Sequence, residues 1–82
     1  MNRERLTDKV AEYEARLARG KADRIRPGDV QEVLRKLRKT IADLEAGRTA
    51  AATDDRKVRL DRKLTVARAH AARAEWLLDR LT

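Results

Sequence analysis

Residues 54–81 read DDRKVRLDRKLTVARAHAARAEWLLDRL, a stretch that contains neither glycine nor proline. Leucine and alanine recur along it at alternating steps of four and three residues, which is the spacing of one face of an α-helix. The residues on this face are Leu60, Leu64, Ala67, Ala71, Ala74, Leu78 and Leu81. At roughly 1.5 Å per residue the helix would be about 42 Å long. It is the longest surface in the chain, so we expect the other helices to pack against it.

Residues 29–46 carry the strongest amphipathic pattern of the chain. Its apolar positions are Val30, Leu34, Leu37, Ile41 and Leu44, with Val33 widening the stripe. Asp29 and Glu32 are spaced as a capping box, in which each side chain accepts a hydrogen bond from the other residue's backbone N–H. Pro27 as the first helical residue is an alternative start. Gly47 is expected to end the helix, because glycine favours the left-handed position that follows a helix.

Residues 3–19 are predicted to form a further helix that comes first in the chain. Its narrow apolar stripe consists of Leu6, Val10, Tyr13 and Leu17, with steps of four, three and four. Gly20 is placed to end this helix, and Ile25 in the connector is expected to turn inward. The loop before residue 54 is short, so the second and third helices should be antiparallel neighbours, with Thr53, Asp54 or Asp55 capping the third.

These patterns predict an all-α protein with one small domain spanning residues 1–82. Its helices are expected at about 3–19, 29–46 and 54–81, and the last two should form an antiparallel hairpin with coiled-coil-like packing. The first helix either packs along this hairpin or is exchanged with another subunit. A chain of this size has a marginal core, so a homodimer is plausible.

Composition and charge narrow the class of protein. Charged residues make up 43% of the chain and hydrophobic residues 41%, and the formal net charge is +7. The regular spacing of the apolar residues argues against disorder. Positive charge permits binding to nucleic acid, anionic lipid or an acidic protein surface, and an ordinary solvated exterior is the alternative explanation of the basic side chains. The beginning of the chain lacks the apolar segment of a secretory signal, and no apolar run approaches the ~20 residues of a membrane span, so we expect a cytoplasmic protein.

The third helix carries a second apolar face, nearly opposite the first. Val58, Thr65, Ala69, Ala72 and Trp76 lie on it, and Arg62, Arg73 and Arg80 follow one of its edges. Tryptophan and arginine are enriched at binding hot spots. The leading hypothesis is therefore a non-enzymatic protein–protein interaction module, a small regulatory or assembly factor that acts on a protein partner or on itself. Its predicted contact residues are Trp76, Leu77, Arg62, Arg73, Arg80, Ala69 and Ala72. The alternative is that the Trp76 face packs on the first helix inside a three-helix bundle.

Chemistry of other kinds has little support in the sequence. The chain has no cysteine or serine, and its one histidine, His70, has no metal-ligating residue at the helical spacing of four. The glycines all lie at predicted helix ends, so no phosphate-binding loop is present. We therefore predict no enzymatic activity, no catalytic residue, no cofactor, no metal site and no small-molecule substrate.

A second hypothesis is a basic nucleic-acid-binding or ribonucleoprotein module. The cations that would contact phosphates are Arg35, Lys36, Arg38, Lys39, Arg56, Lys57, Arg59, Arg62 and Lys63. No aromatic residue is interleaved among them for base stacking, and no zinc-finger or RNP motif occurs. A third, weaker hypothesis is a small inhibitor that covers an acidic surface of a nucleic-acid enzyme.

Overall fold

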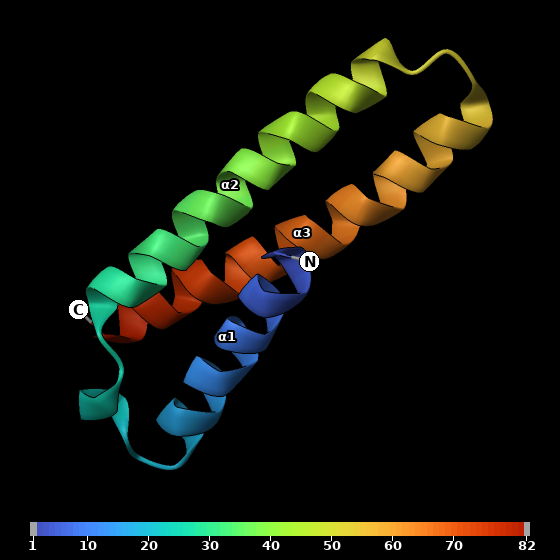
Figure 1. Cartoon of the computed structure of the whole chain (residues 1–82). Helices are drawn as coiled ribbons and strands as arrows, with labels where there is room; N and C mark the ends of the chain where they lie inside the picture. Colours follow the sequence, from blue (N-terminus) through green and yellow to red (C-terminus); the bar gives the residue numbers. More distant parts are fainter. Residues whose placement is uncertain (1, 82) are drawn as a thin grey trace.

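The fold is that of a helical hairpin with a third helix beside one of its ends. The computed structural model describes the backbone of residues 2–81 and the side chains of residues 6–81. Its elements are α1 (Asn2–Ala18), a short 3-10 helix (Ala22–Arg24), α2 (Pro27–Ala50) and α3 (Asp54–Leu81). Residues 2–81 include no strand. The predicted all-α class and the antiparallel pairing of α2 with α3 are confirmed (Figure 1).

The hairpin is long and α1 covers only part of it. The molecule measures 47 × 20 × 18 Å along its principal axes. In Figure 1, α1 lies beside the first half of α2 and the second half of α3, whereas the other halves of these helices run on without it. We call residues 2–40 and residues 68–81 together the three-helix end. Residues 41–67 form the two-helix end.

The core divides along the same line. At the three-helix end it contains side chains from all three helices and from the connector: Leu6, Val10, Tyr13, Ile25, Val30, Val33, Leu34, Leu37, Ala71, Ala74 and Leu77. At the two-helix end it contains only Leu44, Leu60, Leu64 and Ala67, with Ile41 and Ala51 packed against them. The first helix therefore packs within its own chain, and Ile25 turns inward as predicted.

The end of α1 follows the prediction. Gly20 has a φ of +74°, the left-handed conformation that glycine adopts without steric cost. The N–H of Gly20 donates to the carbonyl of Leu17 at 3.0 Å, and that of Lys21 donates to the carbonyl of Arg16 at 2.9 Å. This pair of bonds is the Schellman motif, which satisfies carbonyls that the helix leaves open.

The start of α2 corrects the predicted capping box at Asp29. The helix begins two residues earlier, at Pro27, and Arg26 precedes it without a side-chain capping bond. Proline suits the first helical position, because its fixed φ is helical and the N–H that it lacks would have no partner there. Glu32 accepts a hydrogen bond from Arg35 at 2.6 Å. The alternative start at Pro27 is therefore the correct one.

The end of α2 corrects the predicted stop at Gly47. The helix continues through this residue to Ala50, so it has 24 residues. Packing outweighs the low helix propensity of one glycine here, because Leu44 and Ala51 both contact the core of the two-helix end. Thr53 then caps α3, as predicted, by accepting a hydrogen bond from the N–H of Arg56 at 3.3 Å.

Candidate protein-binding surface

Trp76 lies on the outer face of α3, away from the core. Its side chain is 46% exposed, and the guanidinium of Arg80 lies over the indole ring at 4.9 Å from the ring centroid. The two residues are one helical turn apart, so α3 itself holds them in this cation–π arrangement. The alternative in which this face packs on the first helix is wrong.

Leu77, which we predicted as a contact residue next to Trp76, belongs to the core. It has no exposed surface at all. The periodic pattern placed Leu78 instead of Leu77 on the inner face and did not locate the first helix, whereas α1 packs on the flank of α3 that carries Leu77 and covers it. Leu78, which the pattern placed in the core, is only partly buried. Leu77 is therefore not available to a partner.

The other apolar positions of the predicted face are exposed. Ala69 and Ala72 lie on the outside of α3 together with Trp76, and Val58, near the start of the helix, is 48% exposed. We call Ala69, Ala72, Trp76 and Arg80 the Trp76 face. Small residues beside a large aromatic side chain would let a partner approach the helix backbone closely.

The two other predicted arginines are exposed but have different surroundings. The Nε atom of Arg73 is 4.0 Å from a carboxylate oxygen of Glu14, so this arginine connects α3 with α1. Arg62 lines a groove near the first turns of α1. The structure thus keeps Arg80 with Trp76 and gives Arg73 and Arg62 other neighbours.

The nine cations of the nucleic-acid hypothesis fall into two groups. Four of them have a carboxylate partner: Arg35 pairs with Glu32, Arg38 with Glu75, Lys39 with Asp43, and Arg59 with Asp55. The remaining cations form no ion pair with the described side chains; they are Lys36, Arg56, Lys57, Arg62 and Lys63. The hydrogen bond from Arg35 lowers the pKa of Glu32. This carboxylate therefore offsets part of the positive charge of the cations. No single surface collects all nine.

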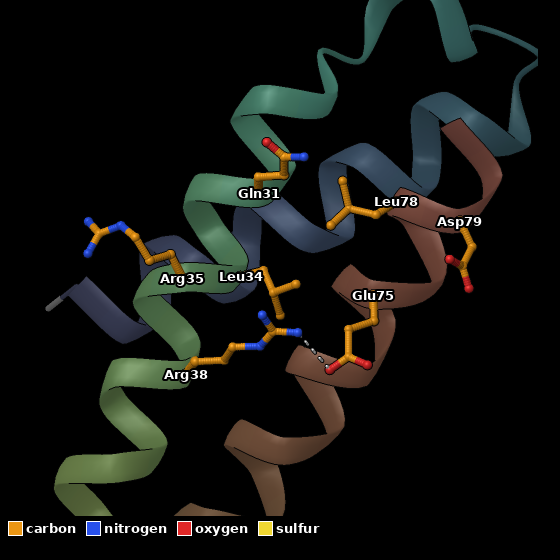
Figure 2. Close-up of a pocket in the computed structure, with 7 residues that line it drawn as sticks. All are labelled: Gln31, Leu34, Arg35, Arg38, Glu75, Leu78 and Asp79. Carbon is orange, nitrogen blue, oxygen red and sulfur yellow. Dashed lines mark ion pairs between the residues drawn. The ribbon is translucent and has the colours of Figure 1, made fainter. Parts of the chain in front are cut away.

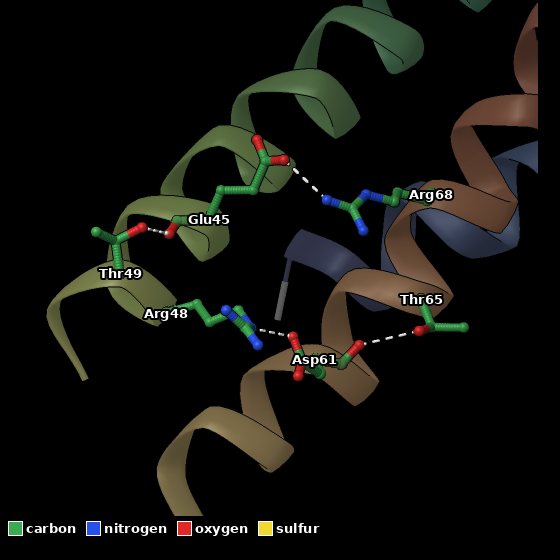
Figure 3. Close-up of polar contacts among 6 residues, drawn as sticks. All are labelled: Glu45, Arg48, Thr49, Asp61, Thr65 and Arg68. Carbon is green, nitrogen blue, oxygen red and sulfur yellow. Dashed lines mark hydrogen bonds and ion pairs between the residues drawn. The ribbon is translucent and has the colours of Figure 1, made fainter. Parts of the chain in front are cut away.

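One edge of the hairpin carries ion pairs that sequence reasoning missed. Arg38 of α2 pairs with Glu75 of α3 at 3.7 Å (Figure 2). Arg68 of α3 pairs with Glu45 of α2 at 2.8 Å, as Figure 3 shows.

A third pair completes this edge near the hairpin loop. Arg48 donates to Asp61, and this bond raises the pKa of the arginine (Figure 3). The three α3 members, Asp61, Arg68 and Glu75, follow one another at steps of seven residues and alternate in charge. Each exposed pair adds at most about 1 kcal/mol, so their main effect is to favour one antiparallel register. A heptad pattern could have suggested the edge, but the partners follow only once the register is known.

Two of the grooves between α2 and α3 contain apolar side chains in their walls. The first has a volume of about 520 Å³ and contains Leu34 and Leu78 between charged side chains, two of which are the paired Arg38 and Glu75 (Figure 2). The second has a volume of about 260 Å³ and nearly apolar walls. Its lining residues are Thr7, Leu37, Thr40, Arg62, Lys63, Val66, Ala67 and His70.

Other kinds of site find no geometric support in the described part of the chain. No three histidine, aspartate or glutamate side chains there gather closely enough to hold a metal ion. His70 is partly exposed at the junction of the three helices. No helix within residues 2–81 is both long enough and apolar enough to cross a membrane.

No family model, curated protein or solved structure matches this chain. A functional assignment therefore depends on the chain's own surfaces. The strongest of these are the Trp76 face and the apolar groove beside α1.

Proposed function

We propose that this protein is a non-enzymatic interaction module, a small regulatory or assembly factor that binds a protein partner through the outer face of α3. The observation that carries the proposal is the half-exposed indole of Trp76 with Arg80 over its ring. A small core would gain apolar burial from an indole, yet this one stays half exposed. An exposed tryptophan next to arginine is the composition of a binding hot spot.

The rest of the helix supports this proposal. At the three-helix end its inner face and one flank are already occupied by α2 and α1, so the outer face there remains for a partner. Ala69 and Ala72 add no bulk beside Trp76. A partner would supply an apolar pocket for the indole and a carboxylate for Arg80, and both are common features of protein surfaces.

The fluorescence of Trp76 can test this proposal, because Trp76 is the only tryptophan of the chain. Its fluorescence reports burial of the indole directly, whether the partner is another protein or a second copy. We expect a blue shift of the emission on association, with an apparent mass above the 9.4 kDa of one chain. A monomer whose emission stays constant over concentration would direct the search to a separate partner.

The decisive variant is Trp76→Ala, with Val58→Ala as its matched control. Both side chains are exposed to a similar extent on the same helix, at 46% and 48%. We expect Trp76→Ala to weaken association about thirtyfold or more, which corresponds to about 2 kcal/mol, as for a hot-spot residue. Both variants should keep their stability within about 0.5 kcal/mol, because neither position is in the core. Global unfolding of Trp76→Ala, or equal binding by both variants, would contradict the proposal.

A nucleic-acid-binding module is the second candidate, and one observation favours it. Of the cations without an ion pair, four belong to the first half of α3: Arg56, Lys57, Arg62 and Lys63. Binding of this kind would weaken steeply with salt and show little sequence preference. A labelled oligonucleotide titrated at several salt concentrations separates the candidates. Replacing Lys57 and Lys63 with glutamate should abolish this binding, whereas Trp76→Ala should leave it unchanged.

A further inference from the structure

The flank that α1 covers at the three-helix end continues uncovered at the two-helix end. Under α1, the flank positions are Val33 of α2 and Leu77 of α3, and both are buried. Seven residues beyond Val33, the same flank of α2 carries Thr40. Fourteen residues before Leu77, the same flank of α3 carries Lys63, which is exposed. The hairpin therefore has a second packing position for a helix, in line with α1, and no described part of the chain fills it.

This second packing position contains the groove of about 260 Å³ with nearly apolar walls. Leu37 and Ala67 lie in its wall between the helices, and Val66 stands beside them with 56% of its surface exposed. Thr7 borders the groove from the first turns of α1. An incoming helix would therefore meet α1 end to end and would continue its line along the hairpin.

Among the described side chains, the charge around this groove is positive and unbalanced. Arg62 and Lys63 line it, and neither forms an ion pair with a described side chain. The adjoining hollow, which also contains Thr40, adds Lys36. The acidic residue in that hollow, Asp43, is already within 3.7 Å of Lys39. An occupant therefore gains by bringing carboxylates.

We propose that this groove is a docking site for an acidic amphipathic helix of a partner protein. A second copy of the chain fits less well, because its equivalent flank would bring the same cations against Arg62 and Lys63. Nucleic acid fits less well too, since the walls are nearly apolar and contain no phenylalanine, tyrosine or tryptophan for base stacking. The proposal is independent of the Trp76 face, which lies on another side of α3.

The way in which α1 packs shows what the occupant should look like. Its buried positions, Leu6, Val10 and Tyr13, step by four and three residues. Beside them, Glu14 of α1 lies next to Arg73 of α3. Residues 54–67 of α3 extend about 20 Å at 1.5 Å per residue, which accommodates a partner helix of three to four turns. The occupant should therefore carry apolar residues at this spacing and carboxylates facing Lys63.

A synthetic peptide can serve as the probe. It would have leucine at steps of four and three over four turns, and glutamate at the flanking positions. A matched peptide would carry lysine in place of each glutamate. Binding is followed by backbone amide shifts in the isotope-labelled protein. We expect saturable binding of the glutamate peptide and no saturable binding of the lysine peptide. The largest amide shifts should occur around Thr40, Lys63 and Val66.

Matched variants make the test specific. Val66→Gln should weaken binding roughly fivefold, because it removes apolar contact area, whereas Val58→Gln on the same helix should change it by less than about twofold. Lys63→Glu should weaken binding roughly tenfold through charge reversal, while Lys57→Glu, outside the groove, should have a smaller effect. All four positions are at the surface, so the fold should persist.

Several outcomes would overturn this inference and leave the Trp76 proposal standing. Equal binding of the two peptides would show that charge does not select the occupant. Shifts centred on Tyr13 and Leu77 would mean that the peptide displaces α1 instead. Loss of binding in Trp76→Ala but not in Val66→Gln would place the peptide on the other face. Absence of saturable binding would also reject the groove as a site.

Discussion

The two ends of the hairpin are built from the same two helices but differ in what holds them together. At the three-helix end, α1 turns flank positions such as Val33 and Leu77 into core. At the two-helix end, the core is a single stripe, and the exposed pairs of Arg48 with Asp61 and of Arg68 with Glu45 lie beside it. Apolar burial scales with the area removed from water, whereas exposed ion pairs add little. α1 therefore accounts for much of the apolar burial, and the corresponding flank of the two-helix end stays uncovered.

The sharpest test of this difference is one substitution made at both ends. Leu77→Ala and Leu64→Ala remove the same atoms from side chains that are 0% and 2% exposed. Leucine-to-alanine changes in cores destabilise by 2–5 kcal/mol, depending on how far the site can collapse. We expect about 4 kcal/mol at Leu77, which three helices enclose, and about 2 kcal/mol at Leu64, where two helices can close together. Chemical denaturation followed by circular dichroism measures both values.

Hydrogen exchange shows whether these losses are global or local. Leu77→Ala should speed amide exchange throughout the chain, because the three-helix end holds the molecule together. Leu64→Ala should speed it mainly within residues 41–67, since local opening there leaves α1 in place. A larger loss of stability for Leu64→Ala than for Leu77→Ala would refute the comparison.

A smaller effect separates two glycines, one at each end. Gly47 lies within α2, and a Cβ atom there would meet only Leu60 Cδ1 at 3.8 Å, an ordinary contact. Gly47→Ala should therefore stabilise the two-helix end by about 0.5–1 kcal/mol. Gly20 has a φ of +74°, so Gly20→Ala should destabilise the chain by about 1 kcal/mol. Thermal unfolding of both variants tests these opposite effects. Melting temperatures that shift in the same direction for both variants would contradict them.

The sequence predicted the fold well because periodicity is a local property. The stripes at Leu60 to Leu81 and Val30 to Leu44, and the turn at Gly20, follow from spacing and backbone conformation alone. Leu77 was misplaced because its burial depends on where α1 packs, which no local pattern states. Gly47 was misread for a similar reason, since tertiary contacts carry α2 past a weak helix former.

The candidate sites divide in the same way. The place of Trp76 opposite the inner face of α3 follows from periodicity, but its exposure does not, because the sequence left open whether the first helix covers this face. The groove at Val66 did not emerge from the sequence, because it exists only where α1 stops along the hairpin. The cross-helix partners of Arg38 and Arg68 likewise needed the register of the hairpin.

A rise in pH should weaken the three-helix end through the ionisation of Tyr13. Burial of Tyr13, and next the carboxylate of Asp29, raise the pKa of the phenol above its ordinary value of 10.0. The folded chain thus holds this proton more tightly than the unfolded chain does. The resulting stability is complete below pH 10.0 and is lost as the pH rises through the raised pKa. Tyr13 is the only tyrosine, so phenolate absorbance reports its titration directly.

Tyr13→Phe is the control, because lysines also lose their charge in alkaline solution. We expect the wild-type chain to lose more stability than Tyr13→Phe above pH 10, by release of α1 from the hairpin. The losses caused by Leu77→Ala and Leu64→Ala should then converge, since without α1 both ends consist of two helices. If the difference between these two variants instead persists after Tyr13 has ionised, α1 is not its source, and the contrast lies within α2 and α3 themselves.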